Sequence, residues 1–175
     1  MRLLTFQRLA RYVTADTWAR LRREPCPLRV CRCDVPQDLN GITLGDLLEL
    51  QGKSYAELLS VAPKVLLHLS GNKVARLEVG KAGGLANMVA AELERIGKMW
   101  QECRVTPTEA EKRAGAEALN FGPSGLVDWF AKRQGISDHD RVLQVPWLTV
   151  WQCLKIDSEK TNYERRLLAA QKPKK

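Results

Sequence analysis

The chain has 175 residues, a length that suits one domain or one domain with a small appendage, and that excludes two large domains. Hydrophobic residues make up 45% and charged residues 27%, which is the composition of a protein with a buried core and not of a disordered or collagen-like chain. No run of about 18 apolar residues occurs, so we expect a soluble chain that does not cross a membrane.

The formal net charge of +8 is concentrated at the start of the chain. Residues 1–33 carry eight arginines and two acidic residues, whereas residues 34–175 carry twenty basic and eighteen acidic residues. Positive charge favours anionic partners, and Arg20, Arg22 and Arg23 form the densest group. We consider these three arginines as candidates for contact with nucleic acid or another anion; the alternative is a solvated or partner-facing arm.

The opening residues reach Arg8 before any apolar run of signal-peptide length, which predicts a protein that is not secreted. For such a protein the five cysteines, an odd number, predict free and mostly buried thiols instead of a disulfide framework. Cys26, Cys31 and Cys33 lie within eight residues, but His68 is the one nearby candidate for a fourth ligand. We therefore expect no metal site, and the role of the three thiols stays open.

Residues 1–40 are predicted to form a basic N-terminal arm. Asp16 is expected to cap a short helix over residues 17–23, because its carboxylate can accept hydrogen bonds from free helix amides. Residues 28–35 alternate apolar and polar side chains, which predicts one short strand or hairpin. The turn-rich segment that follows, residues 36–41, places a boundary near residue 40.

A helical domain is predicted over residues 41–104. Thr43 with Asp46, and Ser54 with Glu57, each have the spacing of a capping box at a helix start. A third short helix is expected from Pro63 to Leu69. The longest apolar stripe then runs from Leu85 to Cys103 at intervals of three or four residues and predicts a long helix.

The segment Gly80-Lys81-Ala82-Gly83-Gly84 precedes that stripe. It resembles a phosphate-binding glycine loop, but it lacks the G-x4-G-K-[ST] pattern and a convincing strand before it. We interpret it as a hinge at which the long helix starts.

A C-terminal helical subdomain is predicted over residues 105–171, followed by a basic tail at 172–175. Thr106 is expected to cap a helix that extends to about Leu119, and a further helix is expected over residues 126–133. Ser137 is expected to cap one turn, and Pro146 can start the last helix, with either a bend near residue 158 or final turns that pack elsewhere. No repeat of fixed period is visible. The predicted fold is mainly α, a compact multi-helix domain.

Side chains that could carry enzyme chemistry are few and scattered. His68 lies in an apolar run, where a core or rim position is expected, and His139 lies in an exposed cap. The carboxylate pairs are two residues apart, on different helix faces, and are interpreted as surface or capping residues: Glu92 and Glu94, Asp138 and Asp140. We therefore expect no catalytic residues, no cofactor and no enzymatic activity.

Aromatic side chains are concentrated in the C-terminal subdomain, at Trp129, Phe130, Trp147 and Trp151. Large aromatic side chains dominate both protein cores and interfaces. We consider two interpretations for these four residues, which are packing in the core and docking of a partner in a groove.

Two parts of the sequence resemble small morphogenesis proteins of tailed bacteriophages, and tail assembly chaperones in particular. The resemblance covers roughly residues 36–71 and 117–168, and is carried by helix-capping and apolar residues. The segments that carry it are Ile42–Gln51, Leu58-Leu59, Val65–Gly71, Phe121-Gly122, Leu126–Asp128, Val145–Trp147, Leu154-Lys155 and Tyr163–Leu167. The Arg-rich start and the glycine-rich segment 80–84 are not part of the pattern.

The resemblance implies a non-enzymatic chaperone that binds an apolar helical partner, such as the tape-measure protein, until the tail tube forms around it. It implies a location in the host cytoplasm or in the virion. The alternative is a structural virion component, a head-tail adaptor or tail-associated protein, whose basic arm contacts neighbouring subunits or DNA. Nucleic acid is then a secondary partner, and no membrane partner is expected.

Overall fold

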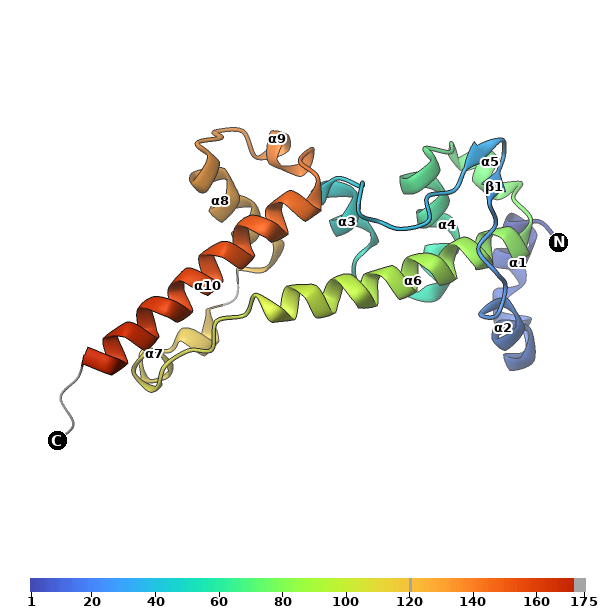
Figure 1. The fold of residues 1–175 in the computed structure, drawn as a ribbon. Coiled ribbons are helices and arrows are strands. Elements are labelled where there is room, and N and C mark those ends of the chain that lie inside the picture. The colour runs from blue at the N-terminus through green and yellow to red at the C-terminus, as the bar shows by residue number, and fades with distance from the viewer. Residues whose placement is uncertain (120, 172–175) are drawn as a thin grey trace. The chain divides into compact units, whose positions relative to one another are not determined.

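The structure is a computed structural model that describes residues 1–119 and 121–171. It is mainly α-helical with one two-stranded antiparallel hairpin, which confirms the predicted fold class (Figure 1). The predicted basic tail at 172–175 lies outside the described residues. None of the helices in the described part is both long and apolar enough to span a membrane.

By its internal contacts the chain divides into two compact units, Met1–Arg95 and Ile96–Lys175. The first unit contains two short helices, the hairpin, three further helices and most of a long helix that continues past its boundary. Its elements are α1 (Leu3–Leu9), a 3₁₀ turn (Ala10–Tyr12), α2 (Ala15–Leu21), β1 (Arg29–Val30), β2 (Cys33–Asp34), α3 (Leu44–Leu50), α4 (Tyr55–Leu67), α5 (Gly71–Ala75) and α6 (Val79–Glu102). The chain start is fixed beside α6, because Leu3 N donates to Leu77 O (2.8 Å) and Val79 N donates to Met1 O (3.0 Å).

The second unit contains the last turns of α6 and the helices that follow. Its further elements are α7 (Glu109–Arg113), a 3₁₀ turn (Ala116–Ala118), α8 (Gly122–Gln134), α9 (His139–Leu143) and α10 (Trp147–Gln171). Helix α10 is continuous over 25 residues, so the bend considered near residue 158 does not divide the helix.

Helix starts show how far local sequence decides structure. The capping boxes at the starts of α3 (Thr43 with Asp46) and α4 (Ser54 with Glu57) are confirmed. In each, the carboxylate accepts a hydrogen bond from the backbone N–H of the cap residue, and the hydroxyl of the cap residue accepts one from the backbone N–H of the acidic residue. Three predicted caps are wrong by one or two residues. Thr14 instead of Asp16 caps α2, Thr108 instead of Thr106 caps α7, and Asp138 instead of Ser137 caps α9.

Two predicted helix boundaries, one in each unit, are also wrong. Helix α4 continues through Pro63 to Leu67, so the separate helix expected from Pro63 does not exist. The helix expected to reach Leu119 ends instead at Arg113, where Gly115 follows with a φ of 85° and turns the chain.

The alternating segment 28–35 forms a hairpin and not a single strand. Arg29 pairs with Asp34 and Val30 with Cys33, and the two residues between them, Cys31 and Arg32, have left-handed φ values of 50° and 69°. A two-residue turn leaves the apolar–polar alternation intact, which is why the sequence pattern fits both alternatives.

Gly83 and Gly84 lie inside α6, and they are not a hinge before it. Helix α6 begins at Val79, and an added Cβ atom would collide with Leu21, the last residue of α2, at Gly83 and with Pro25, in the segment after α2, at Gly84. At Gly84 the obstacle is the backbone carbonyl of Pro25, whose carbon would lie 2.7 Å away. The glycines therefore permit close packing of residues 21–25 against α6.

Glu92 on α6 is a structural residue, although the sequence suggested a surface position. Its carboxylate accepts hydrogen bonds from the backbone N–H of Leu39 (3.0 Å) and from Arg95 Nε (2.9 Å) and Nη2 (2.7 Å). The bonds from Arg95, together with the one from Leu39, hold the pKa of Glu92 below its usual value, although partial burial opposes this. The carboxylate thereby fixes the segment before α3 to α6.

Glu92→Gln is expected to lower the free energy of unfolding by about 1–3 kcal/mol at pH 7, because hydrogen bonds to a charged acceptor are lost. The lowered pKa means that this contribution is present above the unfolded-state pKa of about 4.3 and is lost as the pH falls through the folded-state value. Urea unfolding of both proteins at neutral pH and at about pH 3.5 measures the difference. A difference that is equal at both pH values would contradict the role of the charge.

The chain contains the same succession of helices twice, a repeat that the sequence letters do not reveal. Helices α4, α5 and α6 have 13, 5 and 24 residues, and α8, α9 and α10 have 13, 5 and 25. The first helix of each set ends in a left-handed residue, His68 (φ 49°) or Gly135 (φ 66°), and the short helix buries a valine, Val74 or Val142. The shared features are backbone geometry and burial, which residues of different type can provide.

Candidate functional site

The four aromatic residues singled out in the C-terminal region all lie in the second unit, where two of them belong to its core. Trp147 is fully buried and its ring centroid lies 6.4 Å from that of Trp100, while Phe130 is 2% exposed. Trp129 and Trp151 are half-buried. Of these four residues, only Trp129 and Trp151 therefore present aromatic surface to solvent. The four do not line an open groove together.

Trp151 is held by its polar edge. Its indole N–H donates to the backbone carbonyl of Met99 at 2.9 Å, and the Lys155 ammonium lies 5.1 Å from the centre of its ring. A second bond that sequence analysis missed lies further along α10, where the buried Ser158 hydroxyl donates to Cys103 O at 2.6 Å. These contacts fix one side of α10 to the end of α6 within the second unit.

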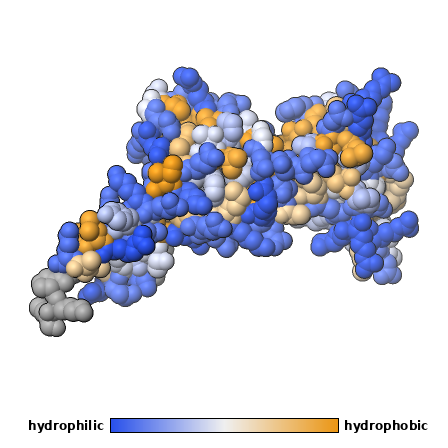
Figure 2. Space-filling model, in the orientation of Figure 1, coloured by the Kyte–Doolittle hydropathy of each residue, from blue (hydrophilic) through white to orange (hydrophobic). Residues whose placement is uncertain are grey.

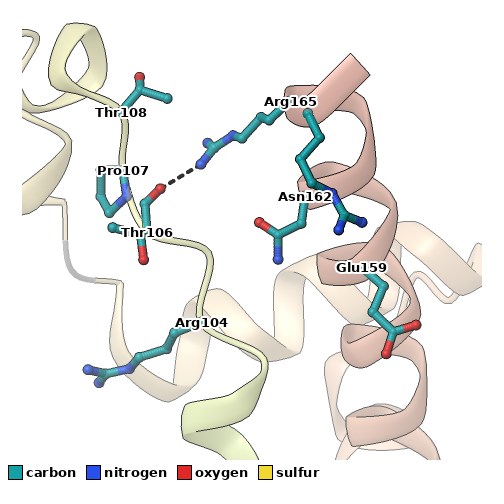
Figure 3. Close-up of a pocket in the computed structure, with 8 residues that line it drawn as sticks. Arg104, Thr106, Pro107, Thr108, Glu159, Asn162 and Arg165 are labelled. Carbon is teal, nitrogen blue, oxygen red and sulfur yellow. Dashed lines mark hydrogen bonds between the residues drawn. The ribbon is translucent and has the colours of Figure 1, made fainter. Parts of the chain in front are cut away.

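A pocket with a volume of about 760 Å³ lies between α10 and the segment before α7 (Figure 3). Arg165 crosses it, donating from Nη1 to Thr106 O (2.6 Å) and from Nη2 to the Glu111 carboxylate (2.8 Å). Hydrogen bonds from the Thr108 backbone and hydroxyl, supported by Arg165, lower the pKa of Glu111. Through these bonds Arg165 connects α10 to the segment before α7 and to the start of α7.

Helix α10 carries an apolar stripe on the side opposite to its packed face. The stripe consists of Ile156, Tyr163 and Leu167, which are 58%, 57% and 43% exposed. Their spacing of seven and four residues places them on one side of the helix, whereas Ser158 and Arg165 lie about half a turn away. Figure 2 shows apolar side chains at the surface near the C-terminal end of α10. Sequence analysis did not identify the stripe, because it left open whether the helix bends near residue 158 or its final turns pack elsewhere.

The arginines Arg20, Arg22 and Arg23 lie at the C-terminal end of α2, in a segment that we call the arginine turn (Arg20–Arg23). All three side chains are exposed. The arginine turn lies against α4 and α6, because the carbonyl of Leu21 accepts hydrogen bonds from Tyr55 Oη (3.2 Å) and Asn87 Nδ2 (3.1 Å).

Further contacts hold the backbone on both sides of the arginine turn. Asn87 Nδ2 also donates to Glu24 O at 2.8 Å, just after the turn. The Arg22 guanidinium lies 4.9 Å from the centre of the Tyr55 ring, and Trp18 packs edge-on against the same ring. Burial raises the pKa of Tyr55, with the Arg22 charge opposing the shift, so its phenol stays protonated and can donate to the backbone.

The other candidates for chemistry are dispersed. His68 caps the end of α4, His139 begins α9, and both are exposed, so His68 is not in the core. The five thiols are free as expected, but only Cys103 is buried. Within residues 1–119 and 121–171 no three His, Cys, Asp or Glu side chains are grouped so that they could hold a metal ion.

Comparisons with models of known protein families, with curated proteins and with solved structures find no match to the chain.

Proposed function

We propose that the chain is a non-enzymatic assembly protein, a phage tail assembly chaperone, that binds an amphipathic helix of the tape-measure protein along the apolar stripe of α10. The observation that carries this proposal is the stripe itself, three large apolar side chains on the solvent side of a continuous helix. The resemblance of residues 36–71 and 117–168 to tail assembly chaperones supports the choice of partner.

The stripe has the form of a helix-binding surface. Ile156 and Leu167 are eleven residues apart, which corresponds to about 16 Å or three turns of helix. Lys160 and Glu164 form an ion pair (4.0 Å) at its edge and can exchange partners with charges that flank the apolar face of an incoming helix. Burying each stripe side chain contributes about 1.5–3 kcal/mol before the cost of association, which favours a reversible complex. A reversible complex suits a chaperone, because a chaperone must release its partner.

A second candidate function is a structural virion component, and the exposed arginines of the first unit favour it. Such a component stays in the mature particle at a fixed stoichiometry, whereas a chaperone is absent from it. Quantitative protein analysis of purified virions distinguishes the two functions.

Leu167→Lys is expected to weaken binding of the tape-measure protein at least about tenfold, because a charge replaces one of the three apolar side chains that make the contact. The measurement is co-expression with the tape-measure protein of the same phage, followed by affinity capture and titration of the purified partner. Circular dichroism of the free variant checks that the helix content is unchanged.

Leu168→Lys is the matched control. Leu168 is 61% exposed and adjacent in sequence, but it lies about 100° away around the helix, off the stripe. It is expected to retain binding within about threefold of the wild type. Equal loss in both variants, or retained binding in Leu167→Lys, would refute the stripe as the docking site.

A further inference from the structure

The first 33 residues present positive charge that the protein itself does not neutralise. All eight arginines of this segment are exposed. Of these eight, only Arg29 forms an ion pair with a described residue, which is Asp34 at 2.5 Å. Unpaired arginines that share one unit repel each other, which lowers stability unless an anion is bound. The arrangement therefore favours an anionic partner.

The arginine turn is held in place before any ligand binds. Tyr55 and Asn87 bond the carbonyls of Leu21 and Glu24, and the absence of side chains at Gly83 and Gly84 lets this backbone lie directly on α6. Less conformational entropy is lost when a ligand meets side chains on a fixed backbone than when it must order a mobile arm.

Aromatic rings accompany the arginines at both ends of α2. Arg11 lies 4.9 Å from the centre of the Tyr12 ring, and Tyr12 is 69% exposed just before the helix. At the other end Arg22 covers Tyr55. The two ends are separated by about 10 Å, the length of seven helical residues. Exposed aromatic rings next to arginines are suited to stacking of unpaired bases, with guanidinium groups on the phosphates.

We propose that the segment from Tyr12 to Arg23 binds single-stranded nucleic acid, with Arg20, Arg22 and Arg23 contacting phosphates and Tyr12 stacking on a base. Single strands are favoured over a duplex because their bases are free to stack on Tyr12, and because α2 has seven residues, too few to present a row of base-reading side chains to a groove. This site is separate from the α10 stripe and does not depend on the proposed function.

The test is fluorescence anisotropy with a labelled oligothymidine of about 20 nucleotides, which exceeds the usual site sizes for single strands. The variant Arg20→Gln/Arg22→Gln/Arg23→Gln removes three phosphate contacts. The slope of log affinity against log salt is expected to become about 2 units shallower, and the affinity at about 0.1 M salt to fall about 100-fold.

A control variant, Lys53→Gln/Lys64→Gln/Lys73→Gln, removes the same charge from three exposed lysines of the same unit. Its affinity is expected to stay within about threefold of the wild type, because salt screens the attraction between the oligonucleotide and lysines that do not contact it. Equal losses in the two triple variants would overturn the proposal, because net charge would then explain the binding.

Tyr12→Ala separates stacking from charge. It is expected to weaken oligothymidine binding about tenfold with an unchanged salt slope, and to leave binding of heparin, a polyanion without bases, unaffected. Tighter binding to a duplex of the same length, an unchanged affinity of Tyr12→Ala, or no binding of the wild type at low salt would each overturn the proposal.

Discussion

Gly84→Ala is expected to lower the free energy of unfolding by about 3 kcal/mol, because the new methyl group has no room. Its Cβ would collide with the carbonyl of Pro25 and lie 3.1 Å from Pro27 Cδ. The obstacle is backbone, which cannot rotate away as a side-chain end can. Relief requires moving residues 24–27 off α6, and that movement would break the bond from Asn87 to Glu24 O. Urea unfolding followed by far-UV circular dichroism measures the loss.

Gly97→Ala in the same helix is the matched control. No heavy atom lies within 4 Å of its added Cβ, so the substitution is expected to raise the free energy of unfolding by about 0.5–1 kcal/mol through helix propensity. Opposite signs for the two glycines would identify close packing as the reason for Gly84. A stabilising Gly84→Ala would show that α2 and its following segment do not rest on α6 in solution.

The same packing links stability to the proposed nucleic-acid surface. Gly84→Ala removes no charge but displaces Pro25, two residues after the arginine turn, so at temperatures where the variant is folded it is expected to weaken oligothymidine binding without changing the charge of the chain. A fixed backbone position for Arg20–Arg23 would then be needed for affinity, in addition to the guanidinium groups.

Local signals in the sequence predicted those elements that local energetics decide. The capping boxes at Thr43 and Ser54 involve residues three apart, and the apolar stripe of α6 repeats every three or four residues, so both can be recognised without knowing the rest of the fold. The overall α-helical class follows from such signals together.

The start of α7 shows why similar local reasoning failed. Thr106 and Thr108 are each followed three residues later by a glutamate, so both satisfy the capping-box pattern. Arg165, more than fifty residues away, bonds the Thr106 carbonyl and the Glu111 carboxylate, and this pair of contacts favours the cap at Thr108. The choice is made by tertiary structure.

The candidate sites were predicted only in part for the same reason. Arg20, Arg22 and Arg23 stand out in the sequence, but their anchoring by Asn87 depends on a contact across more than sixty residues. The glycines Gly83 and Gly84 suggest flexibility when read alone, whereas their neighbours in space show that they serve packing. The stripe on α10 is visible as a spacing, but its exposure depends on which side of the helix the second unit covers.

Trp147→Ala is expected to cost about 3–5 kcal/mol of unfolding free energy, the largest effect of a side-chain truncation in the second unit. Trp147 is fully buried at the first turn of α10 and packs against Trp100, so its removal leaves a cavity that the surrounding helices cannot fill without moving. Trp151→Phe is expected to cost only about 1 kcal/mol, since it loses the hydrogen bond to Met99 O and keeps most of the ring contacts.

The effect of Trp147→Ala decides between the two interpretations of the C-terminal aromatic residues. If Trp147 is a core residue, Trp147→Ala lowers the urea midpoint strongly. Under conditions in which the variant is folded, it then binds the partner as the wild type does. If Trp147 belongs to a docking groove, the midpoint stays near that of the wild type while partner binding is lost. The burial of Trp147 leads us to expect the first result, with binding carried instead by Ile156, Tyr163 and Leu167 on the opposite side of α10.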